Sequence, residues 1–271
     1  EDAIAREQFH TAPHAIRRGD AAAALSAATL VMTGRISNGA QDHFYLETHA
    51  TLAVPLEDGN IHLYSSTQHP SEVQKLVGCV LDIGIHKVVC EVPRMGGAFG
   101  GKESQASNYA CMAALGATTT GRPVKVWLNR DEDMIQTGKR HPFLSHYEAG
   151  FDSQGVLTAL RVKIYGDAGW SQDLSQPIVD RALFHLDNAY FLENVDFEGR
   201  ICRTNLPSNT AFRGFGGPQG MLVVEDAISR YAERTGRDPA EVRQLNYYGE
   251  SPRDRAPYGQ EITDCRLETI H

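Results

Sequence analysis

Alternating apolar and polar residues predict several half-buried strands along the chain. The longest alternation covers Val156–Tyr165, and Asp152–Gly155 is expected to form the turn that joins it to a strand over Tyr147–Phe151. A further strand is expected at Pro123–Leu128. The dipeptide Asp58-Gly59 predicts a hairpin turn. Three shorter strands are expected to begin one antiparallel sheet, at residues 31–36, 51–55 and 61–65.

Apolar residues at helical spacing, flanked by start and stop signals, predict helices between these strands. Ser71–Gly78 begins with a serine cap and ends with a glycine, and Asp238–Leu245 begins with an aspartate cap followed by proline. Gln172–Phe184 has helical spacing after Pro177, and the alanine-rich stretch 21–30 is compatible with a helix. The mixture predicts an α+β fold in which mixed sheets pack against helices.

A glycine-rich segment, Arg94–Glu103, is the most distinctive part of the pattern. It follows the apolar run Val88–Val92 and precedes a predicted helix over Ser104–Leu115. Its glycines allow the backbone to take positive φ and to approach a ligand closely, and the start of a helix offers unpaired N–H groups. The order strand, loop, helix therefore predicts a cofactor cradle.

A second segment, Ala211–Gly220, repeats this design. It again places Phe-Gly-Gly before a helical pattern, Met221–Ala232. Both predicted helices run out into Thr-Gly-Arg, at 120–122 and 235–237. We expect these two glycine-rich loop-to-helix units to form two walls of one cofactor site.

The first glycine segment also matches a nucleotide-binding pattern in part. Gly96, Gly101 and Lys102 satisfy G-x-x-x-x-G-K, but the next residue is Glu103 where a P-loop has Ser or Thr. A carboxylate at that position would repel phosphate groups. A P-loop-like site is therefore one alternative, and a tight turn that only allows close helix packing is another.

Composition and charge exclude other classes of protein. The chain has 271 residues and a formal net charge of −8, which argues against a nucleic-acid-binding surface. It contains neither an apolar run of about 20 residues, as a membrane span requires, nor a basic and then apolar N-terminal signal. We therefore expect a cytoplasmic protein with no membrane partner.

The cysteines and histidines do not follow the spacing of a metal site. The cysteines are odd in number and have no C-x-x-C spacing, so we expect reduced and mostly buried thiols, at Cys79, Cys90, Cys111, Cys202 and Cys265. No H-E-x-x-H motif occurs, and we expect packing or hydrogen-bonding roles for His43 and His49.

Five segments, taken together and in this order, resemble the molybdenum-cofactor-binding part of the xanthine dehydrogenase/xanthine oxidase family. They lie at residues 41–49, 94–103, 129–134, 138–143 and 204–220. One glycine loop would be a weak signal, but five long segments that span nearly the whole chain are highly specific.

The resemblance implies a molybdopterin cofactor whose molybdenum carries oxo and sulfido ligands. It implies hydroxylation of hypoxanthine and xanthine with oxygen from water, and transfer of electrons to [2Fe-2S] clusters and FAD. The implied partners are the purine substrate, the iron–sulfur and FAD domains and a second molybdenum domain, within an oligomeric enzyme.

The resemblance also implies roles for individual residues. Gln68 corresponds to the glutamine whose side chain approaches the oxo ligand, and Phe99 to the residue whose backbone N–H does the same. Gly100 allows the close approach of the first loop, and Arg213 corresponds to a main-chain contact with the cofactor near molybdenum. Phe215 corresponds to the ring that lies against the substrate.

Two positions discriminate between branches of the family. Xanthine-type members have the glutamate and the arginine that stand here as Glu103 and Arg181, whereas aldehyde oxidases have apolar residues at both places. A guanidinium can stabilise negative charge that develops on a purine oxygen, and a carboxyl group can exchange a proton with a ring nitrogen. The alternative from the residues alone is a structural ion pair between Glu103 and Arg181.

The chain departs from the family pattern in one respect. The general base of the family is a glutamate in a Gly-x-Gly-Glu segment, which is absent here, since Tyr248–Glu250 is not that pattern. We therefore expect 1–271 to be the first molybdenum-cofactor-binding domain of a larger enzyme, without the iron–sulfur, FAD and second molybdenum parts. A domain that keeps the fold without catalysis, and an aldehyde-oxidase-type enzyme, are the alternatives.

Overall fold

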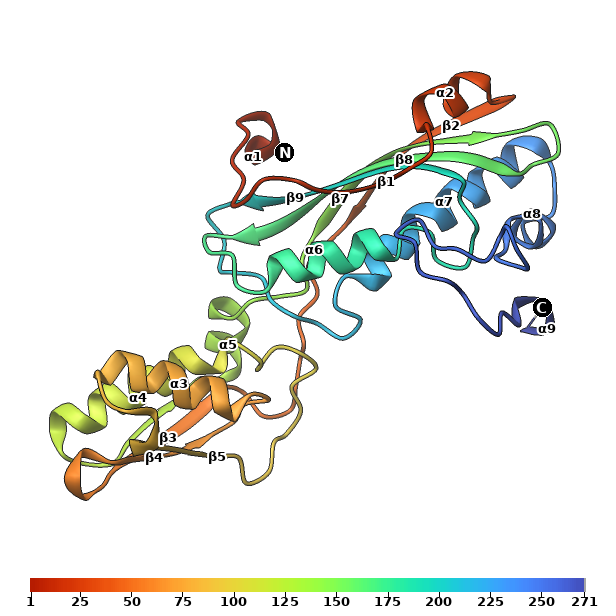
Figure 1. The fold of residues 1–271 in the computed structure, drawn as a ribbon. Helices are drawn as coiled ribbons and strands as arrows, with labels where there is room; N and C mark the ends of the chain where they lie inside the picture. Colours follow the sequence, from red (N-terminus) through yellow and green to blue (C-terminus); the bar gives the residue numbers. More distant parts are fainter. Residues whose placement is uncertain (271) are drawn as a thin grey trace.

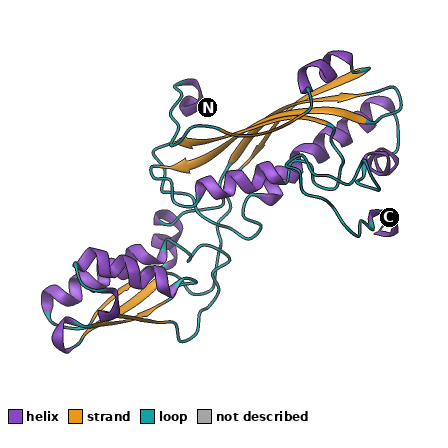
Figure 2. Cartoon of the chain, in the orientation of Figure 1, coloured by secondary structure: helices purple, strands orange, loops and turns teal. Residues whose placement is uncertain are grey.

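The computed structural model describes residues 1–270 and contains two lobes, each built on its own sheet (Figure 1). The small lobe is formed by residues between Ala50 and Gln136, and the large lobe by most of the remaining chain. Both sheets contain parallel and antiparallel pairs, and helices pack on them (Figure 2). The prediction of an α+β fold with mixed sheets is confirmed.

The large lobe is organised around a five-stranded sheet. Its strands, in spatial order, are β1 (His14–Arg18), β9 (Asn194–Arg203), β8 (Leu157–Gly169), β7 (Phe143–Phe151) and β2 (Leu30–Asn38). All neighbours are antiparallel except β8 and β9. Helices α6 (Ser175–Phe184) and α7 (Gly217–Thr235) cover one face of this sheet and enclose the main hydrophobic core (Figure 1).

The small lobe is organised around a four-stranded sheet. Its strands, in spatial order, are β5 (Val88–Glu91), β4 (Ile61–Ser65), β3 (Ala50–Pro55) and β6 (Val124–Trp127). Helices α3 (Pro70–Leu81) and α4 (Ala106–Thr120) pack on one face. The buried face of α4 consists largely of alanine, and these small side chains let the helix lie close to the sheet.

The remaining elements are short. They are α1 (Asp2–Ala5), α2 (Ala21–Ala27), η1 (Glu57–Gly59), η2 (Ile85–Lys87), α5 (Arg130–Gln136), α8 (Pro239–Asn246) and α9 (Leu267–Ile270). No helix within residues 1–270 has the length and apolar character needed to cross a membrane.

Several local predictions are confirmed by the backbone. Helices α4 and α7 end at Gly121 and Gly236, whose φ angles of +63° and +69° are those of left-handed C-terminal caps. Asp238 caps α8 by accepting a hydrogen bond from the N–H of Ala240. The turn at Asp58-Gly59 joins β3 to β4 as an antiparallel hairpin.

The expectation that the three N-terminal strands begin one sheet is wrong. β2 pairs with β7 in the large lobe, whereas β3 and β4 pair in the small lobe. Alternation of apolar residues identifies a strand but does not record its partner, and the chain passes between the lobes after β2.

The predicted boundaries of one helix were also wrong. Helix α3 extends to Leu81 and ends at Asp82 with a φ of +52°, so Gly78 lies inside the helix. Its N-cap is His69, not Ser71. A glycine is the commonest left-handed cap but aspartate also adopts this conformation, which explains the error.

Several elements were not predicted, among them β1, β9 and α5. From Asn194 to Ile201 strand β9 alternates between half-buried and buried residues, and α5 begins with a reciprocal capping box between Asn129 and Glu132. Both signals were present in the sequence. All five cysteines are free, as predicted, but only Cys202 is buried and Cys79 is exposed.

Candidate cofactor site

The two glycine loops have the same backbone conformation at their centres. In the first loop Phe99 has a φ of +54° and Gly100 a φ of +103°. In the second loop Phe215 has a φ of +49° and Gly216 a φ of +91°. Left-handed backbone is strained for phenylalanine, and a strained residue in a loop is a common feature of functional sites. The repeated sequence pattern therefore corresponds to a repeated three-dimensional device.

The two loops are in direct contact with each other. The N–H of Arg213 in the second loop donates a hydrogen bond of 2.9 Å to the carbonyl oxygen of Phe99 in the first. A side chain at Gly100 would place its Cβ 2.7 Å from the carbonyl oxygen of Ala211, so the two backbones pass one another without space for a side chain. The expectation that both loops belong to one site agrees with this contact.

Gln68 joins the end of β4 to the first loop. Its backbone N–H donates to the carbonyl oxygen of Lys102 at 2.9 Å. Its side-chain Oε1 accepts from the N–H of Gly100 at 2.9 Å and from the N–H of Lys102 at 3.3 Å. Because both acceptor contacts are made by the oxygen, the Nε2 group is left as a donor, and it has no partner within residues 1–270.

A second donor in the first loop is also unpaired. The N–H of Gly100 donates to Gln68 Oε1, but the N–H of Phe99 has no acceptor in the described part of the chain. Its ring is 48% exposed. An unpaired N–H in a glycine loop is available to an oxygen-rich ligand.

Lys102 does not face the loop interior, as a P-loop lysine would. The side chain is 0% exposed, and its Nζ donates to the carbonyl oxygen of Glu47 at 2.6 Å and to Ser66 Oγ at 2.7 Å. It also lies 4.5 Å from the centre of the Tyr45 ring. Burial lowers the pKa of Lys102, which the nearby Glu47 carboxylate partly opposes. This lysine stabilises the loop from behind, so it is not available to bind phosphate.

Arg181 lies on α6, against which the second loop packs. The backbone of Gly216 lies against the carbonyl oxygen of Ile178 and the N–H of Ala182, which flank the turn that carries Arg181. The Arg181 side chain is exposed, and the Glu103 side chain is half-buried at the start of α4. Within the described residues neither side chain forms an ion pair, so the structural ion-pair alternative is wrong.

Asp173 connects the two units and was not predicted. Its carboxylate accepts from Ser104 Oγ at 2.8 Å, from Gln105 Nε2 at 2.5 Å and from Thr210 Oγ1 at 3.1 Å. Burial raises the pKa of Asp173, and these hydrogen bonds act in the opposite direction. Asp173 also has an unusual φ of +43°. No pattern in the sequence indicates this backbone geometry, so no sequence signal pointed to the role of Asp173.

The histidines of the 41–49 segment, His43 and His49, have hydrogen-bonding roles, as predicted. His49 is 1% exposed, and its Nδ1 and its backbone N–H both contact the Asp133 carboxylate, at 3.0 Å and 2.8 Å. Burial alone would raise the pKa of Asp133, but the hydrogen bonds from His49 and Tyr45 outweigh it and hold the pKa well below its usual value. Within residues 1–270 no group of three or more His, Cys, Asp or Glu is arranged to hold a metal ion.

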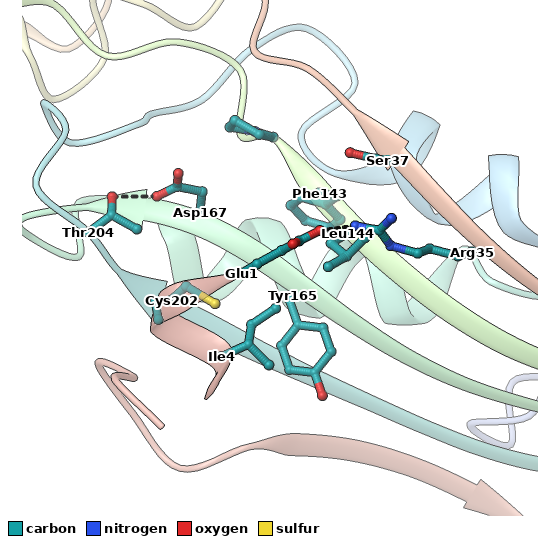
Figure 3. Close-up of a pocket in the computed structure, with 12 residues that line it drawn as sticks. Glu1, Ile4, Arg35, Ser37, Phe143, Leu144, Tyr165, Asp167, Cys202 and Thr204 are labelled. Atoms are coloured by element: carbon teal, nitrogen blue, oxygen red, sulfur yellow. Dashed lines mark hydrogen bonds and ion pairs between the residues drawn. The ribbon is translucent and has the colours of Figure 1, made fainter. Parts of the chain in front are cut away.

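The large lobe contains a cavity of ≈ 170 Å³. Figure 3 shows the side chains that line it, among which Glu1 pairs with Arg35 and Thr204 donates to Asp167. A larger groove of ≈ 750 Å³ runs along α4 and includes Asp173. The predicted site residues do not line either of these two cavities.

Comparison with known proteins agrees with this arrangement. A family model described as "Molybdopterin cofactor-binding domain" matches residues 5–247. The chain belongs to this family. The matched region contains both glycine loops, Gln68 and α6, so the family assignment covers every predicted site residue.

The family relatives include enzymes with xanthine in their names. Xanthine dehydrogenase of Drosophila subobscura is 47% identical over 260 residues, and xanthine dehydrogenase/oxidase of Felis catus is 48% identical over 268 residues. These matches cover 96% and 98% of the chain but only 19% and 20% of the relatives. The chain therefore spans about a fifth of the length of the curated relatives it matches.

Solved structures of the family have the same fold. The aldehyde oxidoreductase of Desulfovibrio gigas matches with a TM-score of 0.85 and 28% identity, over 92% of this chain and 27% of that one. Quinoline 2-oxidoreductase of Pseudomonas putida 86 matches with a TM-score of 0.82 and 25% identity, over 92% and 32% of the two chains.

Proposed function

We propose that this chain supplies one wall of the molybdopterin site in a molybdenum hydroxylase that oxidises hypoxanthine and xanthine to urate. The observation that carries the proposal is the pair of joined glycine loops with two unpaired donors, the N–H of Phe99 and the Nε2 of Gln68. The identity to relatives named xanthine dehydrogenase supports the same enzyme class.

The residues present fit such a cofactor. Molybdenum of this class carries oxygen ligands that accept hydrogen bonds, and the first loop offers donors whose protein partners are missing. Gln68 is oriented by two backbone N–H groups, so its amide presents the donor and not the oxygen. When bound, the cofactor would supply the metal-centred oxidation and the transfer of oxygen from water.

Arg213 is proposed to contact the cofactor through its main chain. Its N–H is engaged with Phe99, and its carbonyl oxygen accepts from Arg140 at 2.9 Å. One lone pair of that oxygen stays available, because a carbonyl accepts two hydrogen bonds. The ring of Phe215, which lies two residues further along the second loop and has a φ of +49°, is proposed to lie against the substrate.

Glu103 and Arg181 are proposed to recognise the purine. Each is a charged side chain without an ion-pair partner in the described residues. Glu103 ends the first glycine segment, and Arg181 lies on α6, which the second loop contacts. The guanidinium would stabilise negative charge on a purine oxygen, and the carboxyl group would hydrogen-bond to or exchange a proton with a ring nitrogen.

The rest of the enzyme belongs to the same proposal. We infer that 1–271 is the first molybdenum-cofactor-binding domain, and that the general base, a second molybdenum domain, [2Fe-2S] clusters and FAD lie elsewhere in the enzyme. This division agrees with the fifth of the relatives' length that the chain spans. The cytoplasmic location and the oligomeric enzyme remain predictions.

The test replaces the two charged residues in the complete enzyme. Arg181→Met is expected to lower kcat/KM for xanthine by roughly 10²–10³, as loss of one such donor does elsewhere, and to affect an aromatic aldehyde far less. Glu103→Val should also weaken purine turnover, because a site built for polar groups discriminates through them. The double replacement should shift preference towards aldehydes.

A matched control is Arg122→Met, an exposed arginine in the loop after α4. It should leave both substrates unchanged, and molybdenum content should be equal in all variants. If xanthine and aldehyde turnover fell by the same factor in Arg181→Met, the residue would be holding the fold or the cofactor. If aldehyde were the better substrate of the unmodified enzyme, the aldehyde-oxidase-type alternative would replace the purine assignment.

A further inference from the structure

The segment 41–49 lies behind both glycine loops, and the proposed site makes no use of it. At one end Gln41 Oε1 accepts from Arg140 Nε at 3.0 Å, and the same arginine donates to the carbonyl oxygen of Arg213. Towards the other end the Glu47 carboxylate accepts from the N–H of Gly96 at 2.8 Å. The segment therefore reaches the second loop through Arg140 at one end and contacts the first loop directly at the other.

His43, within this segment, contacts both loops with one side chain. Its Nε2 lies 2.6 Å from the carbonyl oxygen of Ala211, and its ring centre is 4.7 Å from that of Phe212, both in the second loop. On the first loop, a Cβ at Gly101 would lie 2.8 Å from the imidazole ring. The imidazole is thus wedged between the two backbones, with 6% of its surface exposed.

The chemistry of this contact determines the state of the histidine. A carbonyl oxygen can only accept, so Nε2 must carry the hydrogen. Burial lowers the pKa of His43, and the imidazole is therefore neutral at neutral pH. A neutral ring with its hydrogen on Nε2 can donate to the carbonyl oxygen of Ala211 and pack against the Phe212 ring at the same time.

We propose that His43 is a positioning residue that fixes the two glycine loops to each other. The loops are also joined by the backbone hydrogen bond from the N–H of Arg213 to Phe99, and His43 adds a second connection. The loop residues that His43 contacts are not among those proposed to bind the cofactor or the substrate. The consequence for the cofactor rests on the proposed function, whereas the coupling of the loops does not.

The experiment measures amide hydrogen exchange in the cofactor-free enzyme, peptide by peptide. His43→Phe keeps a ring beside Phe212 but removes the donor to Ala211, and exchange in 95–103 and in 211–217 should both become roughly tenfold faster, as the loss of one buried hydrogen bond predicts. His43→Gln restores a donor at about the reach of Nε2, so exchange in both segments should return towards the original rates.

His62→Phe is the matched control, because His62 pairs with Glu91 and stacks on Tyr64 in the small sheet and contacts neither loop. Exchange in both loops should be unchanged there. If His43→Phe does not fold, His43→Asn, whose amide is too short to reach Ala211, replaces it in the comparison with His43→Gln.

Faster exchange in both loops with rescue by glutamine supports the proposal. Faster exchange in only one loop, no change in either, or equal exchange in the glutamine variant and the donor-free variant would overturn it. Molybdenum content of the same variants, expressed with molybdate, separates this inference from the proposed function. Coupled loosening of the loops with unchanged molybdenum would confirm the positioning role and count against the cofactor site.

Discussion

The carbonyl oxygen of Phe99 accepts a hydrogen bond of 2.9 Å from the N–H of Arg213, and this bond joins two loops that lie far apart in the sequence. It is possible because Gly100 has no side chain, since a Cβ there would meet the backbone of Ala211 at 2.7 Å. The two loops therefore meet through their backbones, and buried side chains such as Lys102 and His43 stabilise them on the side away from the proposed site.

Gly100→Ala should separate the two loops. The φ of +103° is strained for alanine, and the methyl group also clashes with Ala211, so we expect a loss of about 2–4 kcal/mol in the free energy of unfolding. The control is Gly121→Ala, which has a φ of +63° but open space around its Cβ and should lose only about 1 kcal/mol. Urea unfolding of both variants measures the difference. Equal losses would show that the two backbones can move apart without cost.

Gln68→Glu should separate the two functions of this side chain. A carboxylate still accepts hydrogen bonds from the N–H groups of Gly100 and Lys102, so the free energy of unfolding should stay within about 1 kcal/mol of that of the original protein. The outward donor is lost, and turnover of the complete enzyme should fall by roughly 10² or more. Gln68→Ala should lose stability as well. Full activity in the glutamate variant would remove Gln68 from the proposed site.

Lys102→Met should destabilise the first loop. The change leaves the carbonyl oxygen of Glu47 and the hydroxyl of Ser66 without a buried donor, at an expected cost of about 2–3 kcal/mol in unfolding free energy. Lys125→Met, on an exposed lysine of β6, should change it by less than about 0.5 kcal/mol. Chemical denaturation compares the two. A rise in melting temperature of the unmodified protein with ATP would revive the nucleotide-binding alternative.

His141→Gln should flatten the dependence of stability on pH. Burial lowers the pKa of His141 from 6.5 to about 4, so between these values the unfolded chain binds a proton that the folded chain does not. The stability contributed by the neutral imidazole is present above pH 6.5 and is lost as the pH falls towards 4, by roughly 2–3 kcal/mol.

Glutamine does not titrate and can still hydrogen-bond to Ser175, which lies 2.7 Å from His141 Nε2. The difference in unfolding free energy between the original and the variant should therefore shrink between pH 7 and pH 4. Measurements at several pH values, with the variant as reference, cancel the contributions of all other groups. A constant difference would mean that folding does not change the pKa of His141.

Local signals were sufficient for most of the individual elements. The alternation over 156–165 appears as β8, the Asp-Pro start at 238–239 as α8, and the glycines after α4 and α7 as their C-terminal caps. Each of these features depends on conformational preferences of residues that are close together in the sequence, within one turn or one strand. The partner of β2 was mistaken because pairing is a relation between distant segments.

The same division holds for the site. The glycine pattern and its repetition specified two cradles, because only glycine-rich sequences tolerate this succession of positive φ angles. Only the folded structure shows three further features of the site. They are the buried Nζ of Lys102, the hydrogen bonds of Asp173 to residues near both loops, and the position of His43 between the two loops. Each joins residues separated by tens of positions, and their burial and charge state follow from what the tertiary fold packs around them, which no local pattern records.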